Sequence, residues 1–425
     1  MKPTTYLLIL LTILMPRFAW ASDNWQEFAV WPTTDAQELP DVYGNIIVWQ
    51  QFVTEYGDYD VYIADISNPT ETVILVIGYS NDQINPSVYE NTVVWQDYVI
   101  SERSADWDIT MADISNFTEP EIFVVSDIMY NNEEKPSIHG NIVVWQDGNS
   151  VDFNIYGADI TEPTDPEEFP IAVFDLNQQR PSIYRTTVVW QDDYFGDWDI
   201  FAADIWQRNK PEEFPVSAGE NDQQKPEIWG NIVVWQDNFF GDWDIYAADI
   251  SDLSNPVEFA VTTDESSQIN PDIDGNIIVW QDYRNNNWDI FGYNLITGRE
   301  FQITDNPNDQ TNPAISGNVV VWQDNYGQLT NRPHSQIYAV IIDGPELEQC
   351  ASNVVGNVNS DYRVDFTDLS GIARNRLEYN LELPRRSASQ KQRSRRSASS
   401  KTTDYGMNSR NRIFKFDRRH KIAKD

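Results

Sequence analysis

The sequence predicts an all-β fold, a seven-bladed β-propeller in which an N-terminal strand closes the last blade. Three observations predict it. A Trp-Gln pair recurs seven times, a proline lies nine residues before each of these tryptophans, and the segment missing from the last copy stands before the first. The paired tryptophans are Trp49, Trp95, Trp145, Trp190, Trp235, Trp280 and Trp322, which lie 42 to 50 residues apart. A period of this length is typical of repeat architectures.

Each repeat predicts four short strands. It reads Gln-x-x-Pro-x-Ile-x-Gly-Asn-x-Val-Val-Trp-Gln-Asp, then a variable loop, then Asp-Trp-Asp-Ile-Tyr-Ala-Ala-Asp-Ile and a Glu-Phe-x-Val segment. β-Branched and aromatic residues fill the runs, and Gly, Asn, Asp and Pro separate them. Such a sheet is apolar on both faces, so it must stack between two like neighbours, and seven sheets can close a ring. An open β-solenoid is the alternative, although its rungs are usually shorter than about 30 residues.

The two ends of the repeat region predict how the ring closes. The seventh copy ends after Tyr338 without a Glu-Phe-x-Val segment, whereas Glu27-Phe28-Ala29-Val30 precedes the first copy. Phe28 lies twelve residues before Pro40, as Phe259 does before Pro271. We therefore expect the N-terminal strand to complete the last blade and remove an open sheet edge.

The repeat resembles those of TolB-like (WD40-like) propellers, in which a Pro turn, an apolar strand and an Ile-Tyr strand recur at a similar period. The resemblance covers roughly residues 27–343 and implies a propeller. It implies no particular activity, because propellers include binding proteins, lyases, hydrolases and scaffolds.

The segments around the propeller predict an exported protein. Residues 1–21 are typical of a secretory signal, with Lys2 at the start, an apolar core and Ala19-Trp20-Ala21 before the cleavage point. The core is too short to span a bilayer, so we expect no transmembrane segment after cleavage. The propeller is assigned to residues 22–343, and the mature protein is expected outside the cell or on its surface as a monomer. The single cysteine, Cys350, could pair between chains or remain free.

Charge divides the chain in two. The formal net charge is −38, and residues 384–425 hold 14 Lys or Arg against three Asp, which leaves −49 on residues 1–383. A propeller this acidic should repel nucleic acid. The basic tail, residues 384–425, lacks apolar periodicity and is expected to be disordered, either as an arm for anionic polymers or with no defined role.

Acidic loops that also carry aromatic side chains suggest a carbohydrate ligand. Rings can stack on sugar faces, and carboxylates can accept from hydroxyls or hold Ca²⁺. The alternative is that the rings only cap the hairpins of the blades. These rings belong to Tyr98, Tyr194, Phe195, Phe239, Phe240, Tyr283 and Tyr326.

The repeated polar residues are expected to be structural, because an active site usually breaks the symmetry of a repeat. The glutamine of each Trp-Gln pair, the aspartate that follows it and the Asp-Trp-Asp pairs should satisfy backbone donors and bridge neighbouring blades. Arg103, Arg180 and Arg284 break the repeat and are better candidates for specific contacts. No histidine cluster, nucleophile elbow or phosphate loop is present in the sequence, so no catalytic residue is predicted.

A second module is expected at residues 350–383. Oxygen-bearing side chains fall at loop positions 1, 3, 5, 9 and 12, the spacing of an EF-hand, and position 7 would use its backbone carbonyl. The expected calcium ligands are Asn357, Asn359, Asp361, Arg363, Asp365 and Asp368. The segment resembles a single dockerin repeat with a following α-helix. It departs from that pattern at Asn357, which stands in place of Asp, and at Tyr362, which stands in place of the usual Gly.

These features predict a secreted, non-catalytic binding or scaffold protein. Its propeller would bind a glycan or a protein, and the dockerin resemblance implies calcium-dependent attachment to a cohesin-type partner in polysaccharide degradation. The alternative is a propeller glycoside hydrolase or polysaccharide lyase. Acids, or Arg with Tyr or His, that break the symmetry and converge in the channel would favour the enzyme.

Overall fold

The computed structural model describes residues 25–343, apart from residues 69–71, 79, 101–104, 129, 149–151, 175, 263 and 327–333. The expected signal segment, the dockerin-like segment with its calcium ligands, the basic tail and Arg103 therefore lie outside the described residues. Within the described part of the chain, no helix is long and apolar enough to cross a membrane.

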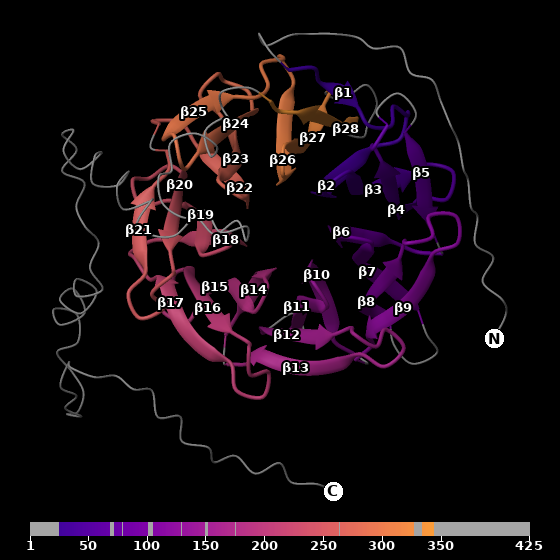
Figure 1. The fold of residues 1–425 in the computed structure, drawn as a ribbon, viewed down its shortest axis with the longest axis horizontal. Coiled ribbons are helices and arrows are strands. Elements are labelled where there is room, and N and C mark those ends of the chain that lie inside the picture. The colour runs from indigo at the N-terminus through magenta and orange to yellow at the C-terminus, as the bar shows by residue number, and fades with distance from the viewer. Residues whose placement is uncertain are drawn as a thin grey trace, which may run out of the picture. The chain divides into compact units, whose positions relative to one another are not determined.

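Seven four-stranded antiparallel sheets surround a central axis, as Figure 1 shows. The innermost strands are β2 (Gln37–Tyr43), β6 (Gln83–Tyr89), β10 (Asn132–His139), β14 (Gln178–Tyr184), β18 (Gln223–Trp229), β22 (Gln268–Asp274) and β26 (Asp309–Ser316). The second strands, which carry the Trp-Gln pairs, are β3 (Ile46–Val53), β7 (Thr92–Ile100), β11 (Ile142–Gly148), β15 (Thr187–Asp192), β19 (Ile232–Asp237), β23 (Ile277–Asp282) and β27 (Val319–Asn325).

The outer half of each sheet comes from the second part of the repeat. The third strands are β4 (Asp58–Asp65), β8 (Ala105–Asp113), β12 (Phe153–Asp159), β16 (Asp199–Asp204), β20 (Asp244–Asp249), β24 (Asp289–Asn294) and β28 (Ser335–Ile341). The outermost strands are β5 (Val73–Ile77), β9 (Glu121–Ser126), β13 (Glu167–Ala172), β17 (Glu212–Ser217), β21 (Val257–Ala260), β25 (Arg299–Gln302) and, for the last blade, β1 (Phe28–Ala29). We number the blades 1 to 7, from β2 to β26.

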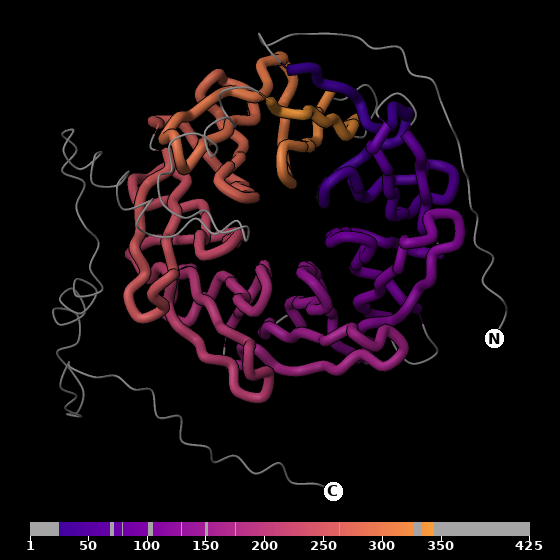
Figure 2. The backbone as a smooth tube through the Cα atoms, viewed as in Figure 1, coloured from indigo at the N-terminus to yellow at the C-terminus, as the bar shows by residue number. Residues whose placement is uncertain are grey.

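The predicted closure is confirmed. Blade 7 has the strand order β1-β28-β27-β26, and Phe28 and Ala29 pair with Ala339 and Tyr338 of β28. The Val30 N–H donates to the Ile337 carbonyl at 2.9 Å, and the Trp25 indole N–H donates to the Asp343 carbonyl at 2.7 Å. Figure 2 shows the indigo start of the described chain beside its orange end.

The hydrophobic core lies between adjacent sheets. All seven tryptophans of the Trp-Gln pairs are fully buried. Trp145 of blade 3, for example, lies in one cluster with Val94, Ile109 and Met111 of blade 2. Each sheet is thus covered on both faces by its neighbours, which is why consecutive residues of the second strands, such as Val233, Val234 and Trp235, are all buried.

A bulge interrupts every innermost strand at the repeated proline. In β18 the pairs Gln224–Gln236 and Glu227–Val234 leave two residues, Lys225 and Pro226, opposite the single Trp235. Proline has no N–H to give to the sheet, so it fits at a bulge on an edge strand. The bulge turns the residue before each proline toward the axis.

Candidate functional site

The candidate site is a channel on the propeller axis. It has a volume of about 740 Å³ and is lined by the innermost strands of all seven blades. Three rings of seven residues line it, one residue per blade. The upper ring consists of the residue before the repeated proline of each blade. The middle ring consists of the residue directly after this proline, and the lower ring of the residue three positions after it.

The upper ring adopts an unusual backbone conformation. Its members all have φ between 51° and 55°, although none is glycine and each precedes a proline. Both features disfavour this left-handed region. The upper ring consists of Leu39, Asn85, Lys135, Arg180, Lys225, Asn270 and Asn312.

A hydrogen bond from the preceding blade holds each member of the upper ring. The glutamine of the Trp-Gln pair accepts from the backbone N–H of the ring residue in the next blade. The acceptor–donor pairs are Gln50–Asn85 at 3.0 Å, Gln96–Lys135 at 3.2 Å, Gln146–Arg180 at 3.1 Å, Gln191–Lys225 at 3.1 Å, Gln236–Asn270 at 3.1 Å, Gln281–Asn312 at 3.0 Å and Gln323–Leu39 at 3.4 Å. The expectation that these glutamines bridge neighbouring blades is correct.

Three positive charges stand together in the upper ring. Lys135, Arg180 and Lys225 come from blades 3, 4 and 5, and we call them the cationic arc. Burial and the neighbouring Arg180 lower the pKa of Lys135 to about 8. Burial, Arg180 and Lys135 lower the pKa of Lys225 to about 8. The three groups therefore repel one another within the channel.

The ends of the cationic arc are fixed by amides. The Lys135 ammonium donates to Asn85 Oδ1 at 2.6 Å, and the Lys225 ammonium donates to Asn270 Oδ1. Asn270 in turn donates to Gln281 Oε1 at 2.5 Å. Among the ion pairs of the described residues, none involves a member of the cationic arc.

The middle ring holds three carboxyl groups: Asp41 of blade 1 and Asp272 of blade 6, which lie on blades without a cation, and Glu227, which shares β18 of blade 5 with Lys225. Burial raises the pKa of Asp41, burial with repulsion from Asp272 raises that of Glu227, and burial with repulsion from Asp41 raises that of Asp272. Asp41 accepts from the backbone N–H groups of Val42 and Val88, and Asp272 accepts from those of Ile273 and Ile315. These two carboxyls thus join blade 1 to blade 2 and blade 6 to blade 7. The remaining members are Ser87, Ser137, Ser182 and Ala314.

Five rings in contact form the wall of the lower end. Their centroids are 4.6 Å apart for Tyr43 and Tyr89, 4.4 Å for Tyr89 and His139, 4.7 Å for His139 and Tyr184, and 5.3 Å for Tyr184 and Trp229. These residues come from blades 1 to 5, and we call them the aromatic arc. All five are half-buried. The lower ring is completed by Asp274 and Ser316.

The loop aromatics that the sequence indicated do not converge. Each contacts a ring of its own blade: Tyr98 lies 5.0 Å from Trp107, Tyr194 lies 5.1 Å from Phe195, and Phe239 lies 5.0 Å from Phe240. Tyr283 lies 5.0 Å from Trp288 and Tyr326 lies 6.3 Å from Tyr338. This arrangement favours the alternative that these rings cap the hairpins.

The repeated aspartates also act structurally. Asp192 and Asp237 accept from the backbone N–H groups of Tyr194 and Phe239 at 2.8 Å. The Trp280 indole N–H donates to Asp282 at 3.0 Å. In the segment that enters blade 5, Asp222 accepts from the Trp198 N–H of blade 4 at 3.1 Å. As expected, Asp192 and Asp237 satisfy backbone donors. The link between blades described here comes from Asp222, which is outside the repeated set.

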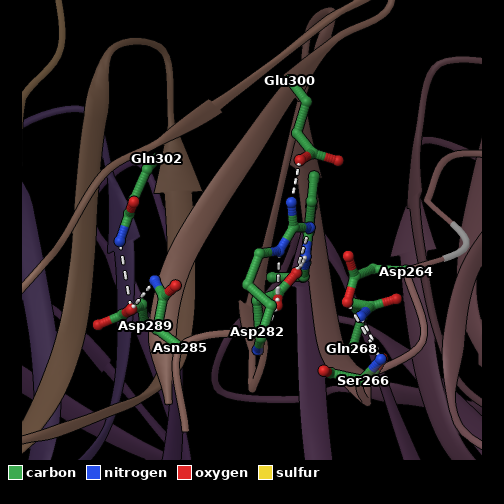
Figure 3. Close-up of polar contacts among 10 residues, drawn as sticks. Asp264, Ser266, Gln268, Asp282, Asn285, Asp289, Glu300 and Gln302 are labelled. Carbon is green, nitrogen blue, oxygen red and sulfur yellow. Dashed lines mark hydrogen bonds and ion pairs between the residues drawn. The ribbon is translucent and has the colours of Figure 1, made fainter. Parts of the chain in front are cut away.

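The arginines that break the repeat have different roles. Arg180 lines the channel, whereas Arg284 donates to Asp282 at 2.6 Å and to Glu300 at 2.5 Å within blade 6. Figure 3 shows these two carboxylates, with Asn285 and Gln302 bound to Asp289 beside them. Arg284 is therefore fully used inside its own sheet, and of the two candidates among the described residues Arg180 remains for ligand contact.

Most of the channel residues were not identified from the sequence, although a signal was present. Alignment of the repeats on their prolines places a cation before the proline in three successive copies and a ring three residues after it in five. Among the described residues, no group of three or more His, Cys, Asp or Glu side chains is arranged to hold a metal ion.

Comparisons with known proteins identify the fold alone. No family model and no curated protein matches the sequence. Among solved structures, the chain is similar to an oligogalacturonate lyase from Vibrio parahaemolyticus, with 11% identity, a TM-score of 0.56, and coverage of 80% of this chain and 98% of the lyase.

Two further solved structures match over part of their own length. A puromycin-hydrolyzing peptidase of Mycobacterium tuberculosis matches with 12% identity and a TM-score of 0.53, over 68% of this chain and 49% of the peptidase. TolB from Acinetobacter baumannii matches with 13% identity and a TM-score of 0.43, over 60% and 62% of the two chains. The chain thus spans about half the length of the peptidase and less than two thirds of TolB. The lyase and the peptidase support the fold alone, and the seven blades follow from the sheet topology of this chain.

Proposed function

We propose that this chain is an exported, non-catalytic binding protein whose propeller channel holds a glycan. The observation that carries the proposal is the aromatic arc, five half-buried rings in contact at the lower end of a channel of about 740 Å³. Rings present flat apolar faces to the C–H faces of sugars, and the serines and amides of the channel can bond to hydroxyls.

The carboxyl groups of the channel favour binding over catalysis. Two carboxyls usually act together in glycoside hydrolysis, one as an acid and the other as a nucleophile or base. Asp41 and Asp272 each accept two backbone N–H groups, which holds them in their structural positions. Glu227 is the remaining carboxyl of the middle ring.

The channel nevertheless meets the criterion that the sequence set for a second candidate, a glycoside hydrolase or polysaccharide lyase, because Arg180, His139 and Glu227 break the repeat and line the channel together. Burial and the nearby Asp272 raise the pKa of Glu227, as is common for a general acid. The test is to incubate oligosaccharides with the protein and with Glu227→Gln. If the protein produces new reducing ends or an unsaturated product and the variant does not, this candidate replaces the first.

The glycan proposal is tested by calorimetry of the chain from Ser22 with a panel of soluble neutral and acidic oligosaccharides. We expect at least one to bind, and Trp229→Ala to weaken it roughly tenfold, the effect of about 1.4 kcal/mol of ring contact. Trp206→Ala is the control, because Trp206 is 78% exposed and does not line the channel. Absence of binding across the panel, or an equal loss in both variants, would rule the proposal out.

Attachment through residues 350–383 belongs to the same proposal. Calcium bound by Asn357, Asn359, Asp361, Arg363, Asp365 and Asp368 would order this segment for a cohesin-type partner, as its dockerin-like spacing suggests. Titration of Ca²⁺ into residues 22–383 should give heat that is lost in a chain carrying Asp361→Ala and Asp368→Ala. Equal heat in both chains would contradict the calcium module.

A further inference from the structure

We infer that the cationic arc and the aromatic arc are two parts of one site, which takes an acidic oligosaccharide with its carboxylates at Lys135, Arg180 and Lys225. The inference deepens the proposed function and rests on it. It adds the chemical class of the glycan and the residues that select it.

The cationic arc differs in charge from its surroundings. The whole chain carries a net charge of −38, and elsewhere in the described residues Arg208, Lys210 and Arg284 pair with carboxylates. Lys135, Arg180 and Lys225 instead stand next to one another without an ion pair in the described part of the chain. Their mutual repulsion is relieved when an anion binds between them.

The cationic arc presents hydrogen-bond donors to the channel. Each ammonium has three N–H donors, and one donor of Lys135 and one of Lys225 contact Asn85 and Asn270. The Arg180 side chain is exposed to the channel, and its planar guanidinium can bind a carboxylate through two parallel N–H groups. An anion between the three groups would therefore meet free donors from three blades.

The cationic arc and the aromatic arc lie close together along the same strands. Arg180 and Tyr184 are four residues apart on β14, as Lys225 and Trp229 are on β18. At about 3.3 Å per residue, the two arcs lie within roughly 13 Å of each other along the channel. Ser137 and Ser182 of the middle ring line the wall between them. A short oligosaccharide can reach both arcs.

Most carboxyl groups of the channel are on blades other than those of the cationic arc. Asp272 and Asp274 belong to blade 6 and Asp41 to blade 1, whereas the cationic arc belongs to blades 3 to 5. Glu227 is the one carboxyl of the middle ring on a blade that also carries a cation. Glu227 faces Arg180, whose positive charge favours its ionised form. An acidic ligand is therefore expected along blades 3 to 5, away from the carboxyls of blades 6 and 1.

The test compares oligomers of glucuronic acid with oligomers of glucose of the same length, by calorimetry on the full chain. We expect the acidic oligomer to bind at least tenfold more tightly at low salt, and this advantage to shrink as salt is added, because salt screens charge. In Arg180→Gln the affinity for the acidic oligomer should fall about tenfold or more, while that for the neutral oligomer stays unchanged. Lys210→Gln is the matched control, since Lys210 is exposed, pairs with Glu212 and does not line the channel.

The outcomes separate the two levels of the proposal. Equal binding of acidic and neutral oligomers would overturn the inference and leave the proposed function standing. Binding of neither oligomer, nor of any other glycan, would overturn both. An oligoglutamate or inorganic phosphate that binds as tightly as the acidic oligomer would overturn the sugar part. A loss in Lys210→Gln equal to that in Arg180→Gln would remove the cationic arc as its cause. Thermal unfolding of each variant checks that the fold is retained.

Discussion

At the scale of single residues, the seven glutamines of the Trp-Gln pairs connect the core to the channel. Each is on the strand of a fully buried tryptophan, and each accepts the N–H of an upper-ring residue in the next blade. The left-handed conformation of that residue costs free energy. The glutamine offsets the cost and fixes where the ring side chain begins. The core of one blade thus positions a channel residue of the next.

This role predicts the effect of removing one glutamine. Gln191 is 4% exposed and accepts from Lys225 N at 3.1 Å. Gln191→Ala should lower the free energy of unfolding by about 1–3 kcal/mol, because the Lys225 N–H loses its acceptor. Urea unfolding measures the change. Gln207→Ala on the exposed surface should have little effect, and an equal loss in the two variants would contradict the role.

At the scale of elements, β1 is the piece that completes blade 7. Its two residues pair with β28, and Val30 continues the contact with a buried side chain. Without β1, the outer edge of β28 would present unpaired backbone groups to solvent.

Removal of this strand should therefore have two effects. We expect a chain that begins at Trp31 to unfold at a lower temperature than one that begins at Ser22, and to self-associate through the open edge of β28. Differential scanning calorimetry and sedimentation measure the two effects. Identical unfolding temperatures and sedimentation for the two chains would show that β1 does not contribute to closure.

The elements could be predicted from the sequence more completely than the site. The blades, the closure and the roles of Gln191 and its equivalents could be predicted because residues that maintain the fold recur in every repeat. The channel depends on what differs between copies, such as Lys225 in one blade and Asn312 in another. Strand alternation alone does not place these residues inward, since the bulge at each proline shifts the register. The calcium ligands from Asn357 to Asp368 stay a prediction.

At the scale of the whole molecule, buried acidic side chains make the stability of the fold depend on pH. Burial and nearby carboxylates raise the pKa of Glu27, Asp60 and Asp108 to about 7, and burial and Asp192 do so for Glu213. In the unfolded chain these groups ionise near pH 4. The folded state therefore binds more protons than the unfolded state. The stability that these groups contribute is fully present below about pH 4 and is lost as pH rises through about 7. His139 acts in the opposite direction below pH 6.5, because its pKa is lowered to about 4 by burial and Arg185.

We expect the unfolding temperature to fall by at least a few degrees between pH 6.5 and pH 8. Glu133 should contribute, because it replaces the glutamine found at this position in the other blades, and burial with Asp147 raises its pKa to about 9. In blade 2 the equivalent Gln83 donates to Asp97 at 3.0 Å. Glu133→Gln should restore that donor and unfold at a higher temperature than the parent at pH 8.

Scanning calorimetry across this range tests both expectations. Glu162→Gln, in an exposed loop, is the control and should follow the parent chain at every pH. An unfolding temperature that rises from pH 6.5 to pH 8 would contradict the linkage, and a Glu133→Gln chain that follows the parent would remove Glu133 from it.

The closure of blade 7 also has a consequence in time. The ribosome makes Phe28 more than 300 positions before its partner Ala339. Contacts between residues so distant in sequence form late in folding. Six blades can therefore assemble in order while the ring stays open, and the channel acquires its final wall only after almost the whole propeller has been synthesised.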